Sequence, residues 1–436
     1  MLKKVFCAFL IISLLLTPIF TVSAYEPSGI SISANAAMLV SLDTDEVLYE
    51  KNADQKVYPA SITKIMTTLL ILESSKYDPN AKIAMTEEAL ELISGTDSSV
   101  SLLKAGDEIT QLDLVYMVLM SSYGDCSLLA AIRYGDTVDN FVNMMNTRAA
   151  ELGLTNTHYE NPIGLHHEEN YTTARDTYTL TKFALQNETF KTVCESARYT
   201  VNASSGKRVL STTNLLQDNT TSYYYQYAKG VKTGYTDEAG RCLVSTASYN
   251  GYNYACLVFG CPPNEKKHFT ESAELYRWAF KNFEFKNVAD TANPVAEIGV
   301  DLSFDTDFVS LYVEKSFKSV LPKDANDSTI SIVTHPIAER IDAPITKGQV
   351  LGTADIIYAE QKLGTVNLIA NENIEKSSLL AVLRLVKNFF TSSYMKIVYV
   401  LIIIAILAFI IAVIKLNSKK SKQRKIKYVP YNDNKK

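Results

Sequence analysis

The first apolar runs of the chain predict a strand pair followed by a core helix. Residues 36–43 form an apolar run that ends in a turn, and residues 46–49 form a second short run, which is typical of a β-hairpin. Pro59 suits a first helical turn, and the uninterrupted apolar residues behind it predict a buried helix over about 59–74.

The next part of the chain follows a helical period. From residue 112 to the mid-150s apolar positions recur at helical spacing, and Gly124 interrupts them, which predicts a loop between two helices. The segment 156–174 is rich in turn residues and predicts a loop. We expect a helix after it, capped by Asp176, and another helix over 269–283.

Alternating and β-rich segments dominate the later part of the chain. Three candidate strands lie at 230–234, 240–247 and 254–260, and Asn250-Gly251 between the last two is a tight-hairpin signal. Short strands separated by turn residues then predict a small all-β domain over 287–374. Strands and helices thus mix, with an antiparallel set late in the first domain, which predicts an α/β fold of the α+β kind.

Both ends of the chain carry membrane-related patterns. Residues 1–24 have two lysines, an apolar run and a small-residue cleavage pattern, which predict a signal peptide. Residues 397–414 carry no charge and are about long enough to cross a bilayer, and dense positive charge follows from Lys415. An interfacial helix is the rival interpretation, but this stretch has no polar face. We therefore expect the body of the protein outside the cell membrane and the tail in the cytoplasm.

The charge balance argues against a nucleic-acid partner. Of 43 Lys and Arg residues, two lie in the first 24 residues and nine lie from Lys415 onward, whereas Asp433 is the only one of 47 acidic residues in either end. The part between the ends therefore has a formal charge near −14. Five cysteines remain beyond residue 24, at irregular spacing, which predicts buried free thiols instead of a disulfide framework.

The candidate chemistry lies in three short strings: Ser61-Ile-Thr-Lys64, Ser122-Tyr-Gly124 and Lys232-Thr233-Gly234. Residues three apart share a helical face, so Lys64 can reach the Ser61 hydroxyl. A lysine takes a proton only when it is neutral, and burial or a neighbouring cation such as Lys232 lowers its pKa. The S-x-x-K pattern by itself is weak, because it also occurs at 101–104, 204–207 and 393–396.

Other kinds of site find little support in the sequence. His166-His167 beside two glutamates lacks the H-E-x-x-H spacing of a metalloprotease, and no C-x-x-C pair is present, so we expect no metal and no cofactor. The chain has no G-x-S-x-G string of a Ser-His-Asp hydrolase. The tyrosine cluster at 223–227 is expected to pack or to lie on the surface.

The strings resemble those of the low-molecular-weight penicillin-binding proteins, the serine-type D-Ala-D-Ala carboxypeptidases. The resemblance rests on Pro59-Ala-Ser-Ile-Thr-Lys-Ile-Met-Thr67, Asn161-Pro-Ile-Gly-Leu165, Tyr171-Thr-Thr-Ala174, Gly230-Val-Lys-Thr-Gly-Tyr-Thr236 and Ala343-Pro-Ile-Thr-Lys-Gly348. It implies a penicillin-binding/β-lactamase-like α/β (α+β) domain with an antiparallel sheet. It also implies peptidoglycan stem peptides as substrates and β-lactam antibiotics as covalent inhibitors.

The resemblance also implies a role for each matching residue. Ser61 would be the nucleophile, Lys64 the general base and Ser122 the proton relay to the leaving D-alanine. The substrate-binding residues would be Lys232, Thr233, Gly234 and Tyr235, on the edge strand of the sheet. The backbone N–H groups of Ser61 and Tyr235 would form the oxyanion hole.

Two departures from the family pattern keep alternatives open. Gly124 stands where the second motif has Asn, and Asn253 stands at about the place of a carboxylate-binding arginine, for which Arg241 could substitute. A peptidoglycan-binding protein with impaired catalysis is one alternative. A class A β-lactamase is another, although it needs a Ser-Asp-Asn motif and a deacylating glutamate, for which Glu160 is the only candidate.

The predicted organisation is a signal peptide at 1–24, a catalytic domain at 25–284, a β-rich domain at 287–374, a helical stalk at 375–395, a transmembrane helix at 397–414 and a basic cytoplasmic tail at 415–436.

Overall fold

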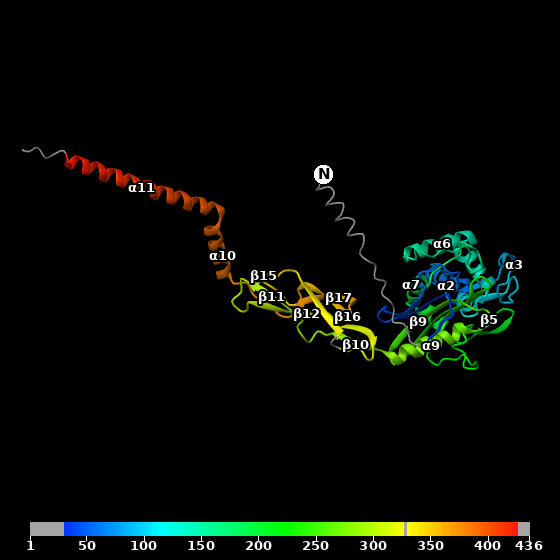
Figure 1. The fold of residues 1–436 in the computed structure, drawn as a ribbon. Coiled ribbons are helices and arrows are strands. Elements are labelled where there is room, and N and C mark those ends of the chain that lie inside the picture. Colours follow the sequence, from blue (N-terminus) through cyan, green and yellow to red (C-terminus); the bar gives the residue numbers. More distant parts are fainter. Residues whose placement is uncertain (1–29, 327–328, 426–436) are drawn as a thin grey trace, which may run out of the picture. The chain divides into compact units, whose positions relative to one another are not determined.

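The structure is a computed structural model that describes residues 30–326 and 329–425, so the predicted signal peptide lies outside the described residues. The chain divides into two compact units (Figure 1). Of the described residues, the first unit covers 30–287 and 318–326, and the second covers 288–317 and 329–425.

The first unit is built on a five-stranded antiparallel sheet in the order β2-β1-β9-β8-β7. Its strands are β1 (Ala36–Ser41), β2 (Val47–Lys51), β7 (Ala228–Thr236), β8 (Gly240–Tyr249) and β9 (Tyr252–Cys261). The predicted hairpin of the first two strands is confirmed. The Asn250-Gly251 turn is confirmed as well, because both residues have the positive φ that this tight turn requires, 51° and 83°. The strand β7 lies at an edge of the sheet.

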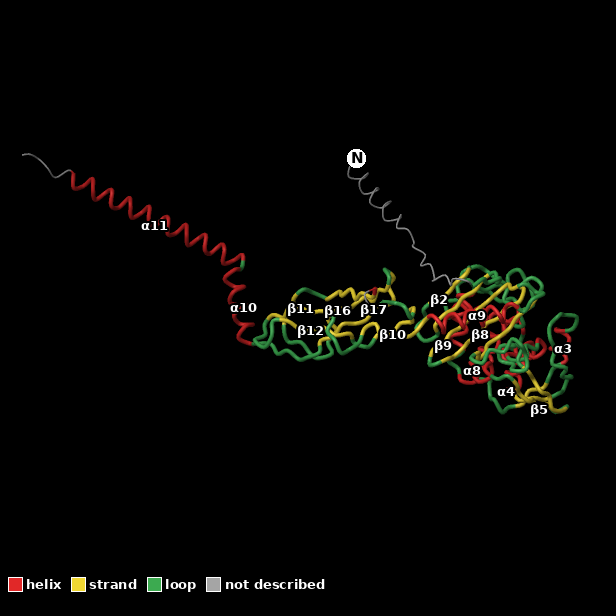
Figure 2. The backbone as a smooth tube through the Cα atoms, turned by 60° about the horizontal axis from the view of Figure 1, so that its bottom comes forward, coloured by secondary structure: helices red, strands yellow, loops and turns green. Residues whose placement is uncertain are grey.

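Alternate residues of β1 enter two apolar clusters on opposite faces of the sheet. Met38 and Val40 belong to the cluster that contains the helix α2 (Lys64–Glu73), whereas Leu39 belongs to the cluster that contains α9 (Lys267–Asn282). Every residue of β1 is buried, because both faces of the strand are covered. Full burial of a large apolar side chain contributes about 1.5–3 kcal/mol to stability. Figure 2 shows the helices of this unit gathered around its strands.

The first unit also contains six further helices and two small hairpins. They are the helices α3 (Glu87–Ile93), α4 (Gln111–Leu119), α5 (Gly124–Gly135), α6 (Val138–Glu151), α7 (Ala174–Ala184) and α8 (Glu188–Glu195), and two small hairpins, β3 (Lys82–Ala84) with β4 (Glu108–Thr110) and β5 (Arg198–Ala203) with β6 (Gly206–Ser211). The predicted interruption at Gly124 is confirmed, since α5 begins there after a short break behind α4.

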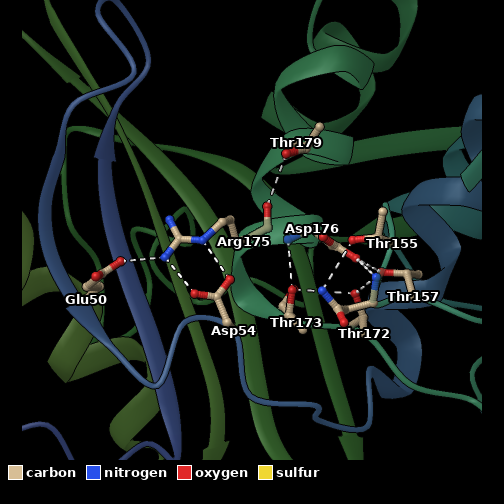
Figure 3. A network of polar contacts seen from close by, with 10 residues as sticks. Glu50, Asp54, Thr155, Thr157, Thr172, Thr173, Arg175, Asp176 and Thr179 are labelled. Atoms are coloured by element: carbon tan, nitrogen blue, oxygen red, sulfur yellow. Dashed lines mark hydrogen bonds and ion pairs between the residues drawn. The ribbon is translucent and has the colours of Figure 1, made fainter. Parts of the chain in front are cut away.

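The cap of α7 corrects one sequence prediction. Thr173 is the capping residue, and its hydroxyl accepts from the Asp176 N–H at 3.0 Å. Asp176 instead lies in the first turn, where its carboxylate accepts from Asn156 N–H and the Thr157 hydroxyl, both at 2.8 Å. Figure 3 shows this network with the Arg175–Asp54 ion pair beside it. Aspartate is favoured both as the capping residue and in the first turn of a helix, so the sequence alone did not distinguish these two positions.

The second unit contains a six-stranded sheet in the order β14-β16-β17-β12-β11-β15. Its strands are β11 (Ala296–Asp301), β12 (Phe308–Val313), β14 (Ile330–Pro336), β15 (Arg340–Asp342), β16 (Val350–Tyr358) and β17 (Gln361–Ala370). Its core includes Val309, Leu311 and Leu368, which are fully buried. A separate two-stranded sheet consists of β10 (Phe283–Ala289) and β13 (Phe317–Pro322), and most of its residues belong to the first unit.

Two helices follow the second sheet. They are α10 (Ser378–Thr391) and α11 (Ser393–Lys425), and Ser392 separates them with an extended ψ of 155°. Within α11, the stretch Ser393–Ser418 is long and apolar enough to cross a membrane, and its apolar side chains are exposed. The described part of the chain therefore contains one apolar C-terminal helix, at the place where the sequence predicts a membrane span.

Candidate active site

Ser61 and Lys64 meet where a short turn of 3₁₀-helix (η1, Ala60–Thr63) passes into α2. Lys64 Nζ lies 3.0 Å from Ser61 Oγ, as the i,i+3 spacing predicts. The lysine side chain is fully buried, because α2 is surrounded by the core of the first unit. The preceding residue, Ala60, has a φ of 47°, a left-handed conformation that is costly for a residue with a side chain.

Burial changes the protonation of both lysines at the site. It lowers the pKa of Lys64 to about 7, although the carboxylate of Asp125 acts in the opposite direction. The pKa of Lys232 also lies well below its ordinary value, first because of burial and second because of the charge of Lys64. The two amines are therefore electrostatically coupled, and a proton on one disfavours a proton on the other. This is the environment that a lysine base needs.

The loop 161–165 holds Lys64 in place. Lys64 Nζ donates to Ile163 O at 2.6 Å, and the Thr67 hydroxyl donates to Pro162 O at 2.7 Å. Asn161 Oδ1 shapes the loop by accepting the Gly164 N–H at 2.7 Å. Gly164 has a φ of 83°, and a Cβ there would collide with Ala60 O. The sequence identified this motif but not its role as the support of the base.

The strand β7 brings the Lys232-Thr233-Gly234 string against Ser61. A Cβ on Gly234 would lie 3.1 Å from Ser61 N and 3.0 Å from Pro59 O, so a larger residue would fit only if these neighbours shifted by a few tenths of an ångström. Lys232 is buried, and its Nζ donates to Thr233 O at 2.9 Å. The Thr233 hydroxyl donates to that of Thr213 at 2.7 Å. Tyr235, the next residue, is exposed.

Ser122 lies two residues before the start of α5, with a φ of 65° and an exposed fraction of 9%. No described residue lies within hydrogen-bond distance of its hydroxyl, so the structure does not link it directly to Ser61 or Lys64. A positive φ in a residue with a side chain marks a backbone that surrounding contacts hold in place. Ser122 shares this property with Ala60.

Comparison with known proteins agrees with this geometry. Residues 21–262 match the family profile described as D-alanyl-D-alanine carboxypeptidase, and residues 283–376 match the C-terminal domain of penicillin-binding protein 5. The chain belongs to the D-alanyl-D-alanine carboxypeptidase family. Its α+β fold with an antiparallel sheet and a C-terminal all-β domain, predicted from the sequence, is confirmed.

Individual relatives cover nearly the whole chain. The carboxypeptidase DacF of Bacillus subtilis is 29% identical over 88% of this chain and 97% of its own length. DacC of Escherichia coli is 30% identical over 79% of this chain and 85% of its own. The structure of penicillin binding protein 5 from Haemophilus influenzae superposes with a TM-score of 0.65 at 27% identity, covering 80% of this chain and 100% of that one.

The first departure from the carboxypeptidase pattern has a structural reason. A Cβ on Gly124 would lie 2.8 Å from Ile93 Cδ1 and closer still to Ser98 Oγ, so the segment after α3 fills the place of a side chain there. Asp125, which follows, is fully buried and accepts the Ser101 N–H at 3.0 Å. A side chain at position 124 would therefore meet the side chains of Ser98 and Ile93.

The second departure requires a correction. Asn253 does not stand at the place of a carboxylate-binding arginine, because it pairs with Ser248 at the far end of β8 and donates to Asp43 at 2.9 Å. Arg241 pairs directly with Tyr235 across β7 and β8, and its guanidinium lies 5.0 Å from the ring of that tyrosine. Arg241 Nε donates to Pro263 O at 2.7 Å. Arg241 thus lies beside the end of the Lys232-Thr233-Gly234 string.

A cavity of about 360 Å³ lies close to the same elements, lined by Tyr58, Tyr171, Glu238 and Ala239 among others. None of the predicted catalytic residues lines it. The exposed His166 stacks edge-on against Tyr58, with ring centroids 4.7 Å apart. In the part of the chain that the structure describes, no group of three or more His, Cys, Asp or Glu side chains could hold a metal ion.

Proposed function

We propose that this protein is a serine-type D-Ala-D-Ala carboxypeptidase that removes the terminal D-alanine from peptidoglycan stem peptides. The observation that carries the proposal is the buried Lys64 amine, 3.0 Å from Ser61 Oγ. A lysine with a pKa of about 7 is substantially neutral at neutral pH and can accept the serine proton. Membership of the carboxypeptidase family supports the same reaction.

Acylation uses these groups in order. Ser61 Oγ attacks the carbonyl carbon of the penultimate D-alanine while Lys64 takes the hydroxyl proton. The backbone N–H groups of Ser61 and Tyr235 stabilise the oxyanion, a role supported by the position of β7 at the sheet edge, close to Ser61 N. The peptide C–N bond then breaks, and the D-alanine nitrogen leaves with a proton relayed through Ser122.

Deacylation and substrate orientation complete the cycle. Water attacks the Ser61 ester, and the serine recovers its proton as the shortened peptide leaves. Lys232, Thr233, Gly234 and Tyr235 bind the substrate along β7. Arg241 adds a guanidinium that suits the terminal carboxylate of the peptide. Penicillins acylate Ser61 in the same way, because their strained amide takes the place of the scissile bond, which makes β-lactams covalent inhibitors.

The apolar helix supports a site at the cell membrane. The stretch Ser393–Ser418 is apolar and exposed, and a run of lysines follows it. We infer a single-pass anchor with the tail at 415–436 in the cytoplasm and the catalytic domain, about 25–284, outside. The β-rich domain at 287–374 and the stalk at 375–395 would raise the active site above the membrane toward the peptidoglycan. The signal peptide at 1–24 would direct export.

Two assays on the full chain in detergent test the proposal. We expect D-alanine release from diacyl-L-Lys-D-Ala-D-Ala and covalent labelling by a fluorescent penicillin, both abolished by Ser61→Ala. Lys207→Ala is a matched control, because it removes an exposed lysine of another S-x-x-K string. Labelling without D-alanine release would instead favour a binding protein, and rapid penicillin hydrolysis would favour a β-lactamase.

A further inference from the structure

The helix α10 (Ser378–Thr391) has an apolar face that no described part of the chain covers. The structure buries none of its 14 residues. Six of its large apolar side chains are between 47% and 58% exposed, namely Leu379, Val382, Leu383, Val386, Phe389 and Phe390. At the angular spacing of an α-helix, these six side chains lie on one half of the helix surface.

The opposite side of α10 faces the β-rich domain. Within the helix, the half-buried residues are Leu380, Ala381 and Arg384, which lie away from the apolar face. The Arg384 guanidinium donates to Asp342 at 2.5 Å and to Asp301 at 2.7 Å, on two strands of the second sheet. The domain therefore holds the helix by its polar side and leaves the apolar face pointing outward.

Charge and position indicate what covers this apolar face. From Lys376 to Lys396 every charged residue is basic. Only Ser392 separates α10 from α11, whose stretch Ser393–Ser418 is long and apolar enough to cross a membrane. The 14 residues of α10 are too few to cross a bilayer themselves. A basic amphipathic helix beside a membrane span is typical of a helix that lies in the lipid interface.

We propose that α10 is a membrane-surface helix, which lies along the outer leaflet with its apolar face among the lipids. Arg384 then ties the β-rich domain to the lipid surface, because the same helix binds that domain on its other side. The segment 378–391 adds little height above the membrane, in contrast to an upright stalk. The inference rests on the proposed membrane anchor and does not depend on the role of Ser61.

Spin labels on the full chain in vesicles of phosphatidylethanolamine and phosphatidylglycerol test the proposal. Single labels are attached at Val386→Cys on the apolar face, at Asn388→Cys on the opposite side and at Ile404→Cys within α11. The unsubstituted chain, treated in the same way, measures the signal from its own thiols. We expect the ratio of accessibility to oxygen, which dissolves in lipid, over that to a water-soluble nickel complex to be several-fold higher at 386 than at 388.

The label at 404 separates this inference from the proposed anchor. Lipid exposure at 404 together with water exposure at 386, or equal ratios at 386 and 388, would overturn the membrane-surface helix and leave the anchor in place. Shielding of 386 from both reagents would also overturn it, because that face would then pack against a second copy of the chain. Water exposure at 404 would reject the anchor and this inference with it.

A further pair of variants tests the tie to the β-rich domain. In an Arg384→Gln background we expect the label at 388 to become more mobile, because the helix loses its charge-assisted bonds to Asp301 and Asp342. Lys387→Gln is the matched control, since it neutralises an exposed cation of the same helix and should leave the mobility unchanged. Equal mobility in the two backgrounds would contradict the role of Arg384.

Discussion

Lys64 Nζ donates a 2.6 Å hydrogen bond to the carbonyl oxygen of Ile163. A neutral amine has two hydrogens and one lone pair. Because this bond directs one hydrogen into the loop 161–165, the lone pair can face the Ser61 hydroxyl on the other side, 3.0 Å away. The loop therefore orients the base as well as burying it.

The pKa of Lys64 predicts a rise of activity with pH. Burial places this pKa at about 7, and only the neutral amine accepts a proton, so the benzylpenicillin acylation constant should rise through pH 7 and then level off. Stopped-flow acylation between pH 5.5 and 9 measures it. A profile that is flat, or that falls with pH, would contradict Lys64 as the base.

The lowered pKa of Lys64 also predicts that the free energy of unfolding depends on pH. Between pH 7 and 10.5 the lysine is protonated in the unfolded chain but largely neutral in the folded one, so the free energy of unfolding gains a contribution that rises with pH over this window. Urea unfolding at several pH values should show that Lys64→Met removes this contribution. An identical pH dependence in the variant would count against a depressed pKa.

The charge of Asp125 should raise the pH at which acylation reaches half of its maximum rate. Its carboxylate raises the pKa of Lys64 against the larger effect of burial. Replacement of the charge in Asp125→Asn should therefore move the pH midpoint of acylation below that of the unsubstituted protein. The variant should also be less stable, because the charge-assisted bonds to Ser101 become neutral ones, at about 1–2 kcal/mol. A midpoint that moves upward would be the contrary result.

Gly164 offers a matched comparison with Gly153. Both have positive φ values, 83° and 74°, but a Cβ at 164 would collide with Ala60 O, whereas one at 153 would meet nothing within 4 Å. We expect Gly153→Ala to cost about 1 kcal/mol and Gly164→Ala clearly more, with loss of acylation. Denaturant unfolding and penicillin labelling check both. Similar costs for the two variants would mean that the loop tolerates displacement.

Arg241 should discriminate substrates by their terminal carboxylate. Arg241→Leu removes a charge-assisted interaction worth about 1.5–3 kcal/mol, so kcat/KM for the tripeptide should fall by about 10- to 150-fold. A tripeptide amide, which lacks the carboxylate, should be affected little. Asn253→Ala is the control, because Asn253 is on β9 and pairs with Ser248, at the other end of β8 from Arg241. An equal loss with both peptides would indicate a structural effect.

Much of the fold follows from local sequence signals. The strand pair of β1 and β2, the helix that carries Lys64 and the Asn250-Gly251 turn were all predictable, because period, turn chemistry and burial agree at these places. The second unit was predictable as β-rich from its spacing of short strands. The return of residues 318–327 to the first unit was not, since no local pattern encodes a long-range crossing.

The site was predictable in its residue types more than in its contacts. The spacing of Ser61 and Lys64 on one helical turn gives their proximity directly. Ile163 contacts Lys64 from 99 positions away in the sequence. Ser98 lies beside Gly124, 26 positions away. No periodicity in the sequence reveals contacts over such separations. The misplacement of Asn253 has a similar cause, because strand register decides which residues face each other across β8 and β9.

The five cysteines of the described chain, Cys126, Cys194, Cys242, Cys256 and Cys261, are all buried and unpaired. The described part of the chain therefore folds without a disulfide bond. Desolvation raises the pKa of Cys242 and Cys256 to about 12, so these thiols are inert while the core stays closed. The rate at which an alkylating reagent modifies these thiols would then report how often the core opens. Each modification requires an opening that exposes the sulfur to solvent.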